Sequence, residues 1–152
     1  MLAAQGEMSE WQVSNPTVIL IAEDDADNRE GYAEYLTFLG YRVEQAADGN
    51  RAWALTEAVH PDVLLLDLAL PGIDGWEVAR RVRSHPGTRA TLIIALSACV
   101  TPGDVQRAQA AGCDLFLDKP CYPEAVAAAI ERMLASRADA GSDPGTTPPS
   151  SS

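Results

Sequence analysis

Three acidic residues in this chain directly follow runs of apolar residues, a placement that suits chemistry. Asp67 follows Val63–Leu66, and the pair Glu23-Asp24 follows Val18–Ala22. Continuous apolar runs of this kind predict strands buried on both faces, as in the middle of a parallel sheet. A Pro-Gly pair at 71–72 predicts a sharp turn soon after Asp67. We therefore expect these carboxylates at the carboxyl ends of strands, where ligands of open α/β sheets bind.

Two further polar residues end predicted strands in the same way. Ser97 follows the apolar run Leu92–Leu96, and Lys119 follows a short strand predicted over 114–118. Parallel strands bring their carboxyl ends to one edge, so a hydroxyl and an ammonium are expected beside the three carboxylates. Asp25, the neighbour of the acidic pair, is instead interpreted as the acid that begins the next helix.

Three converging carboxylates repel one another and need a cation. At about 4 Å and an effective dielectric constant of about 20, each pair costs roughly 4 kcal/mol. Mg²⁺ neutralises such a cluster with oxygen ligands while keeping waters and a place for a phosphate. With Lys119 and Ser97 holding phosphoryl oxygens, Asp67 is placed to attack phosphorus and carry the phosphoryl group as a mixed anhydride. The residues thus predict Mg²⁺-dependent phosphoryl transfer to Asp67.

The elements that must position these residues alternate along the chain. Strand-like runs and helical segments follow one another five times, which predicts an α/β fold with five parallel strands and helices on both faces, (βα)5. Polar residues interrupt the second strand, 41–46, so we place it at an edge. The doubly wound, flavodoxin-like strand order 2-1-3-4-5 then puts the switch point between the first and third strands, where Glu23, Asp24 and Asp67 meet.

The fourth helix is expected to be held weakly. Thr101 can cap it, with Pro102 at the first helical position. Its inward stripe consists only of Val105 and Ala108. Because a helix that buries so little has low local stability, it is expected to shift between states.

Composition limits the classes of protein that fit. Of 152 residues, 22 are acidic and 11 are basic, for a formal net charge of -11. Such a surface disfavours direct binding to nucleic acid or to anionic membranes. Cys99, Cys113 and Cys121 lack the spacing of a disulfide framework or a zinc site, which favours a reducing cytoplasm. Neither a signal peptide nor a membrane-length run is found, so a cytoplasmic location is expected.

The domain boundaries follow from the same patterns. Residues 1–16 are polar and irregular and are interpreted as a flexible leader. One domain is predicted over residues 17–137. Residues 138–152 are rich in Ser, Thr, Pro, Gly and Asp and are predicted to form a disordered polar tail.

Taken together, these motifs resemble the receiver domain of two-component response regulators. The resemblance covers about residues 17–137 and rests, in order, on Glu23-Asp24, Asp67 with 70–75, Ser97-Ala98, Phe116 and Lys119-Pro120. It implies that Asp67 accepts a phosphoryl group from a phosphohistidine of a histidine kinase or a phosphotransfer protein. It also implies that Asp24, Asp67 and the backbone carbonyl of Ala69 bind Mg²⁺ directly, and that Glu23 does so through water.

The resemblance also implies a switch and an output surface. Ser97 and Phe116 match a pair in which the hydroxyl moves to the phosphoryl group and the ring turns inward. Lys119-Pro120 matches the position of a cis peptide bond. The face formed by the helix after Thr101, the fifth strand and the last helix is then the candidate surface for a downstream protein. Because only a polar tail follows the domain, a stand-alone receiver is expected.

The expected chemistry is self-catalysed phosphorylation with slow autodephosphorylation, and no enzyme activity on a separate substrate. Ala69 and Cys99 lie two residues beyond Asp67 and Ser97, and neither side chain orients water well. A receiver-like interaction module that works without phosphorylation remains an alternative. A haloacid-dehalogenase-like phosphohydrolase fits poorly, because that family needs an Asp at the position of Ala69.

Overall fold

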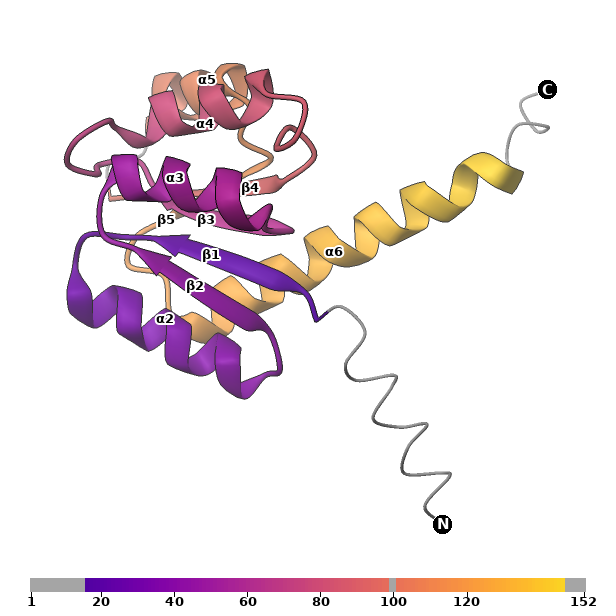
Figure 1. Ribbon diagram of the computed structural model, residues 1–152, viewed down its shortest axis with the longest axis horizontal. Coiled ribbons are helices and arrows are strands. Elements are labelled where there is room, and N and C mark those ends of the chain that lie inside the picture. The colour runs from indigo at the N-terminus through magenta and orange to yellow at the C-terminus, as the bar shows by residue number, and fades with distance from the viewer. Residues whose placement is uncertain (1–15, 99–100, 147–152) are drawn as a thin grey trace, which may run out of the picture.

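The computed structural model describes residues 16–98 and 101–146 as one sheet between two layers of helices (Figure 1). The strands are β1 (Val18–Ala22), β2 (Arg42–Ala46), β3 (Val63–Asp67), β4 (Leu92–Ser97) and β5 (Leu115–Asp118). All neighbouring strands pair in parallel, in the order β2-β1-β3-β4-β5. The predicted fold class and strand order are confirmed, and the more polar second strand does lie at an edge.

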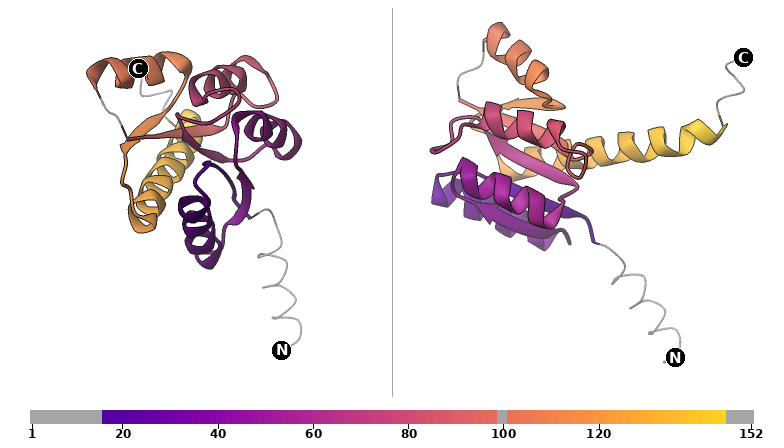
Figure 2. Two further views of the ribbon diagram at one scale, coloured as in Figure 1. Left: turned by 90° about the vertical axis from the view of Figure 1, so that its left-hand side faces the viewer. Right: turned by 45° about the horizontal axis from the view of Figure 1, so that its top comes forward.

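A helix follows each strand in the described chain. The helices are α2 (Ala26–Phe38), α3 (Gly49–Val59), α4 (Gly75–Ser84), α5 (Pro102–Ala111) and α6 (Pro123–Thr146). Figures 1 and 2 show α3, α4 and α5 on one face of the sheet, and α2 and α6 on the other. The chain therefore leaves β1 and β3 towards opposite faces, which opens the switch point between their carboxyl ends.

Side-chain caps begin the four helices from α2 to α5. The capping residues Asp25, Asp48, Asp74 and Thr101 each accept a hydrogen bond from the backbone N–H three residues later. These bonds satisfy N–H groups that have no partner within the helix. The interpretation of Asp25 as a helix-start acid is confirmed.

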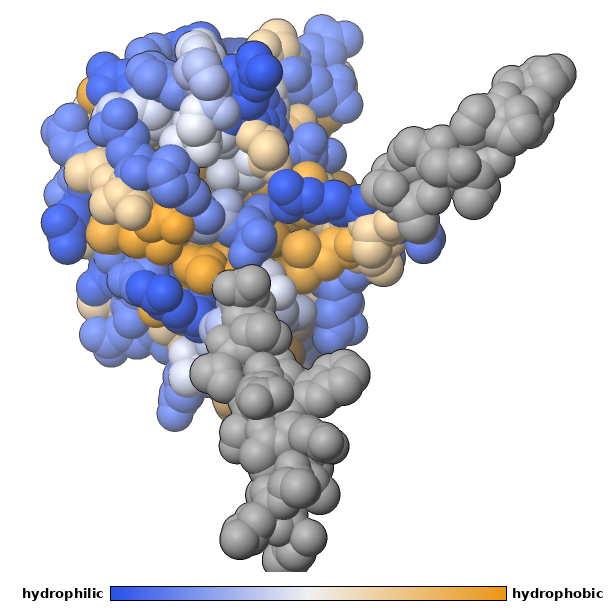
Figure 3. Space-filling view, turned by 45° about the vertical axis from the view of Figure 1, so that its right-hand side comes forward, coloured by the Kyte–Doolittle hydropathy of each residue, from blue (hydrophilic) through white to orange (hydrophobic). Residues whose placement is uncertain are grey.

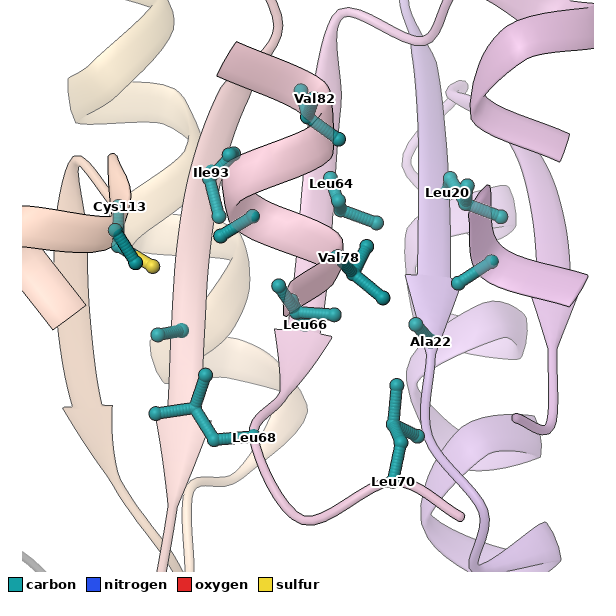
Figure 4. Packing of buried hydrophobic residues seen from close by; sticks show 14 of the residues in the cluster. Leu20, Ala22, Leu64, Leu66, Leu68, Leu70, Val78, Val82, Ile93 and Cys113 are labelled. Atoms are coloured by element: carbon teal, nitrogen blue, oxygen red, sulfur yellow. The ribbon is translucent and has the colours of Figure 1, made fainter. Parts of the chain in front are cut away.

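The residues of β3 alternate between two hydrophobic cores, and all five are buried. Leu64 and Leu66 pack under α4, where Figure 4 shows them beside Val78 and Val82. The opposite side of the strand packs against the core beneath α2 and α6. Because β3 is packed from both faces, the residue at its end is held in a defined position.

Few residues of α5 are buried, as expected for its thin inner stripe. Its buried residues are Ala108, as predicted, and Ala111, whereas the predicted Val105 is only half-buried. The guanidinium of Arg107 lies 4.2 Å from the ring centre of Trp76 on α4, a cation–π contact. A hollow of about 240 Å³ lies between α5 and β5, with Phe116 in its lining. Little apolar area is buried at this helix compared with its neighbours.

The last helix is longer than the sequence predicts. A helix ending near Arg137 and a disordered tail from residue 138 were expected, but α6 continues to Thr146. Alanines at 135, 138 and 140 favour a helix, which accounts for its extension as far as residue 140, but Gly141, Pro144 and Gly145 do not favour one, and nothing in the structure explains the last turns. Its distal part projects away from the sheet (Figure 1). Residues 1–15 of the predicted leader and residues 147–152 of the predicted tail lie outside the described residues.

The side from which α6 projects is mostly hydrophilic. Figure 3 shows apolar side chains gathered near the base of this helix, surrounded by polar ones. Among the helices of the described residues, none combines the length and the apolar character that a membrane span requires.

Gly75 is predicted to be required where α4 begins. A Cβ there would lie 2.6 Å from Leu68 Cα and 2.7 Å from the carbonyl oxygen of Asp67. Gly75→Ala should therefore lower the free energy of unfolding by about 1–3 kcal/mol, measured by urea denaturation.

Gly31, inside α2, is the matched control because a Cβ there has no atom within 4 Å. Gly31→Ala should raise stability by up to about 1 kcal/mol. Equal effects of the two substitutions would show that the contact beside Asp67 is not a tight one.

Candidate functional site

The acidic residues predicted to converge do so at the switch point. Asp67 ends β3 and is 3% exposed, and Glu23 follows β1 and is 1% exposed. Asp24 is next to Glu23 and faces solvent. One carboxylate oxygen of each of the three residues lies within 4.8 Å of the others. Two buried carboxylates and one exposed one therefore share a single site.

Two hydrogen bonds fix the carboxylate of Asp67, and a third holds the backbone just beyond it. Its Oδ1 accepts a hydrogen bond of 2.9 Å from the backbone N–H of Ala69, and its Oδ2 accepts one of 2.9 Å from the Lys119 ammonium. Just beyond it, the N–H of Leu68 donates to the carbonyl of Leu96 at 3.0 Å, which continues the pairing with β4. The carboxylate is thus held at the strand end, with its oxygens directed to two different donors.

Glu23 is held by its own backbone and by Lys119. Its N–H donates to the carbonyl of Ala46 at 3.0 Å, and its Oε2 accepts from the N–H of Asp25 at 3.0 Å. Its Oε1 lies 2.9 Å from the Lys119 nitrogen, but it is buried and accepts no directed hydrogen bond from the described residues. The contact with Lys119 is therefore an ion pair, and Glu23 Oε1 can still accept a hydrogen bond or bind a metal ion. Burial raises the pKa of the Glu23 carboxyl, although Lys119 opposes the shift.

Lys119 is the cation that joins two of the carboxylates. Burial alone would lower its pKa, but the close contacts with the carboxylates of Asp67 and Glu23 outweigh burial and raise it. Its backbone N–H donates to the carbonyl of Ser97 at 2.8 Å, which joins the ends of β4 and β5. The peptide bond from Lys119 to Pro120 is cis. The ammonium therefore stays charged between the acids.

The donor set of this site suits a hard divalent cation. All of its side-chain ligand atoms are oxygens, and three carboxylates outnumber the one ammonium among them. The available buried oxygen of Glu23 is the kind of acceptor that a metal ion or its bound water satisfies. Glu23, Asp24 and Asp67 can hold Mg²⁺, and Ala69, two residues beyond Asp67, remains the predicted carbonyl ligand.

The predicted switch residues lie on adjacent strands. Ser97 is the half-buried last residue of β4 and is paired with Asp118 of β5. Phe116 lies on β5 and packs against the core beneath α5. Their roles stay predictions. Cys99, the other residue predicted to influence dephosphorylation, lies outside the described residues.

Two residues of α2 touch the loops of this site, and sequence reasoning assigned neither a role there. Arg29 Nη1 donates to the carbonyl of Glu23 at 3.0 Å. The hydroxyl of Tyr32 donates to the carbonyl of Cys121 at 2.7 Å. Each bond links a side chain to a backbone carbonyl, so no motif in the sequence marks it.

The fold and the site together define a doubly wound domain with an acidic cluster and a lysine at its switch point. The sequence profile of the response regulator receiver domain matches residues 19–131. The chain belongs to the response regulator receiver domain family, which works in phosphorylation-based signalling.

Similar sequences include several response regulators. Response regulator Rre1 of Synechocystis is 28% identical over 135 residues, which are 88% of this chain and 58% of that protein. The polar-differentiation response regulator DivK of Brucella ovis is 29% identical over 67% of this chain and 83% of its own length. Several curated relatives are thus longer, and this chain spans 58% of Rre1 and 51% of MprA from Mycolicibacterium vanbaalenii.

Solved structures give the same fold. The chemotaxis response regulator CheY4 of Vibrio cholerae superposes with a TM-score of 0.74 and 30% identity, covering 78% of this chain and 98% of that one. A putative response regulator from Chloroflexus aurantiacus has a TM-score of 0.74 and 34% identity over 80% of this chain and 99% of that one. The similarity therefore covers nearly all of each solved receiver domain.

Lys119→Met is predicted to destabilise the metal-free protein and to strengthen Mg²⁺ binding. Without the ammonium, the buried carboxylates of Glu23 and Asp67 lose their shared counter-ion, at a cost on the order of 3 kcal/mol. Mg²⁺ then no longer competes with Lys119, so its stabilising effect should increase. Thermal unfolding in EDTA and across a Mg²⁺ titration measures both effects.

Arg132→Met on the exposed side of α6 provides the charge-matched control. It should leave both quantities unchanged. Unaltered stability and Mg²⁺ affinity in Lys119→Met would show that the ammonium does not neutralise the site.

Proposed function

We propose that the protein is a phosphoacceptor receiver in which Asp67 takes a phosphoryl group from a phosphohistidine on a histidine kinase or phosphotransfer protein. The observation that carries the proposal is the Lys119 ammonium, 2.9 Å from both Asp67 and Glu23, beside the clustered oxygens of Glu23, Asp24 and Asp67. Mg²⁺ is the proposed metal ion, and the cytoplasm, where such kinases present their phosphohistidine, is the proposed location.

In the proposed transfer, a carboxylate oxygen of Asp67 attacks phosphorus. The new O–P bond forms as the P–N bond to histidine breaks, and the imidazole leaves with a proton from solvent. Bound Mg²⁺ supplies positive charge for the transferred oxygens. Lys119 already contacts Asp67 and has only to follow its oxygen to reach the phosphoryl group. The chain acts on itself, so we propose no enzyme activity on a separate substrate.

Phosphorylation is proposed to move the face of α5, β5 and α6. A phosphoryl group adds nearly two negative charges, which gives Ser97 and Lys119 a new partner. The small number of buried residues in α5 and the hollow beside Phe116 support a shift of this helix and an inward turn of the ring. A downstream protein that binds this face would then distinguish the two states.

The proposal predicts one phosphoryl adduct that depends on Asp67. Intact mass spectrometry after incubation with acetyl phosphate and Mg²⁺ should show a single adduct on the wild type. The adduct should be absent without Mg²⁺ and absent in Asp67→Asn, because an amide cannot form the mixed anhydride.

Asp25→Asn is the matched control, since Asp25 caps α2 instead of joining the acidic cluster. It should be phosphorylated like the wild type. A folded wild type without an adduct would reject phosphotransfer and favour the interaction module that works without phosphorylation.

A second prediction concerns the lifetime of the phosphoryl group. Ala69 is exposed beside Asp67, and its methyl group cannot orient an attacking water. Ala69→Asn should shorten the phosphoryl half-life by up to about tenfold, the effect of one well-placed hydrogen bond. Phosphate release from purified phosphoprotein measures this half-life. Ala69→Val should leave it unchanged, and the same half-life in all three proteins would contradict the account.

A further inference from the structure

We propose that α2 positions both charged parts of the site, with Arg29 holding the acidic loop and Tyr32 holding the lysine loop. The inference rests on the proposed function, because these two loops carry the groups that would bind Mg²⁺ and the phosphoryl group. The two side chains are three residues apart, so they lie on one side of the helix. Both donate a hydrogen bond to a backbone carbonyl of a loop next to the site.

Arg29 connects three segments around the acidic pair. Its Nη1 donates to the carbonyl of Glu23 at 3.0 Å, and its Nε donates to the side-chain oxygen of Gln45 on β2 at 3.3 Å. Its backbone N–H also bonds the carbonyl of Asp25 at 2.9 Å. The guanidinium therefore fixes the peptide between Glu23 and Asp24, the two residues whose carboxylates join Asp67 in the cluster.

Tyr32 holds the loop on the other side of the site. Its side chain is buried, and its hydroxyl donates 2.7 Å to the carbonyl of Cys121, two residues beyond Lys119. Burial raises the pKa of this phenol to about 12, so it remains a donor at neutral pH. The bond spans 89 positions of the chain. It ties the backbone that carries Lys119 to the same helix that Arg29 ties to the acids.

The two bonds should therefore affect different steps. Loss of the Arg29 bond frees the acidic loop and should weaken Mg²⁺ binding, while a phosphoryl group held by Lys119 is little affected. Loss of the Tyr32 bond frees the Lys119 loop and should weaken binding of the phosphoryl group, while Mg²⁺ binding is little affected. General loss of stability would instead change both steps together.

For Arg29, the direction of the change in Mg²⁺ affinity distinguishes a positioning role from a purely electrostatic one. Removing a cation beside carboxylates would by itself strengthen Mg²⁺ binding. Weaker binding in Arg29→Met therefore requires that the side chain acts by holding the loop. Gln45→Leu, which removes one partner of Arg29 without changing charge, should shift the affinity in the same direction by a smaller factor.

The experiment compares Arg29→Met and Tyr32→Phe with two matched controls. Tyr35→Phe removes a hydroxyl that makes no hydrogen bond within the described residues, and Arg42→Met removes a cation on β2 that pairs only with Glu44 there. Titration calorimetry measures the Kd of Mg²⁺ without any phosphodonor. Fluorine NMR then measures the affinity for beryllofluoride, a stable phosphoryl analogue, at saturating Mg²⁺. Thermal unfolding of each variant verifies the fold.

Arg29→Met should raise the Kd of Mg²⁺ about threefold to tenfold and leave beryllofluoride affinity at saturating Mg²⁺ unchanged. Tyr32→Phe should lower beryllofluoride affinity about threefold to tenfold and leave the Kd of Mg²⁺ unchanged. Both controls should match the wild type.

The inference is overturned if both variants match the wild type, if each changes both affinities by the same factor, or if Arg29→Met binds Mg²⁺ more tightly. If the wild type binds Mg²⁺ and beryllofluoride and the variants bind both with the same affinities, this inference alone is rejected. A wild type that binds neither rejects the proposed function as well.

Discussion

The structure depends on one electrostatic constraint, which is the crowding of three carboxylates where β1 and β3 end. Lys119 relieves it by contacting Asp67 and Glu23 at 2.9 Å each, from a loop joined to β4 through the carbonyl of Ser97. Charges this close and this buried need a counter-ion, and the arrangement leaves room for a second cation. The same ammonium that neutralises the metal-free site therefore also contacts the carboxylate that is proposed to accept the phosphoryl group.

The rest of the fold keeps these groups in place. Both faces of β3 are packed, so Asp67 cannot move far from the strand end. Gly75 brings the start of α4 against the same peptide, and α2 holds the loops on either side. By contrast, α5 has only two buried residues, fewer than α2, α3 or α4, and it is the element expected to respond. The firm packing beneath Asp67 and the sparse burial of α5 both follow from how apolar residues are distributed.

Much of the fold and the position of the acidic site could be predicted from the sequence, because each rests on local patterns. Apolar runs that end in Asp67 or Glu23 mark buried strands, and the polar second strand marks an edge. The contacts of Arg29 and Tyr32 could not be predicted. Each joins a side chain to a backbone carbonyl, one across a turn of the chain and the other far away in the sequence. The predicted end of α6 near Arg137 was wrong, because alanines as far as residue 140 extend a packed helix, although the composition beyond them suggested disorder.

The central claim is that the carboxylate of Asp67 carries the phosphoryl group. Borohydride reduces an acyl phosphate to an alcohol, so treating the phosphorylated protein would convert the modified aspartate to homoserine. Peptide mass spectrometry then locates the change. The account predicts homoserine at position 67 and nowhere else. Homoserine at position 24 or 25 with an unmodified Asp67 would contradict it.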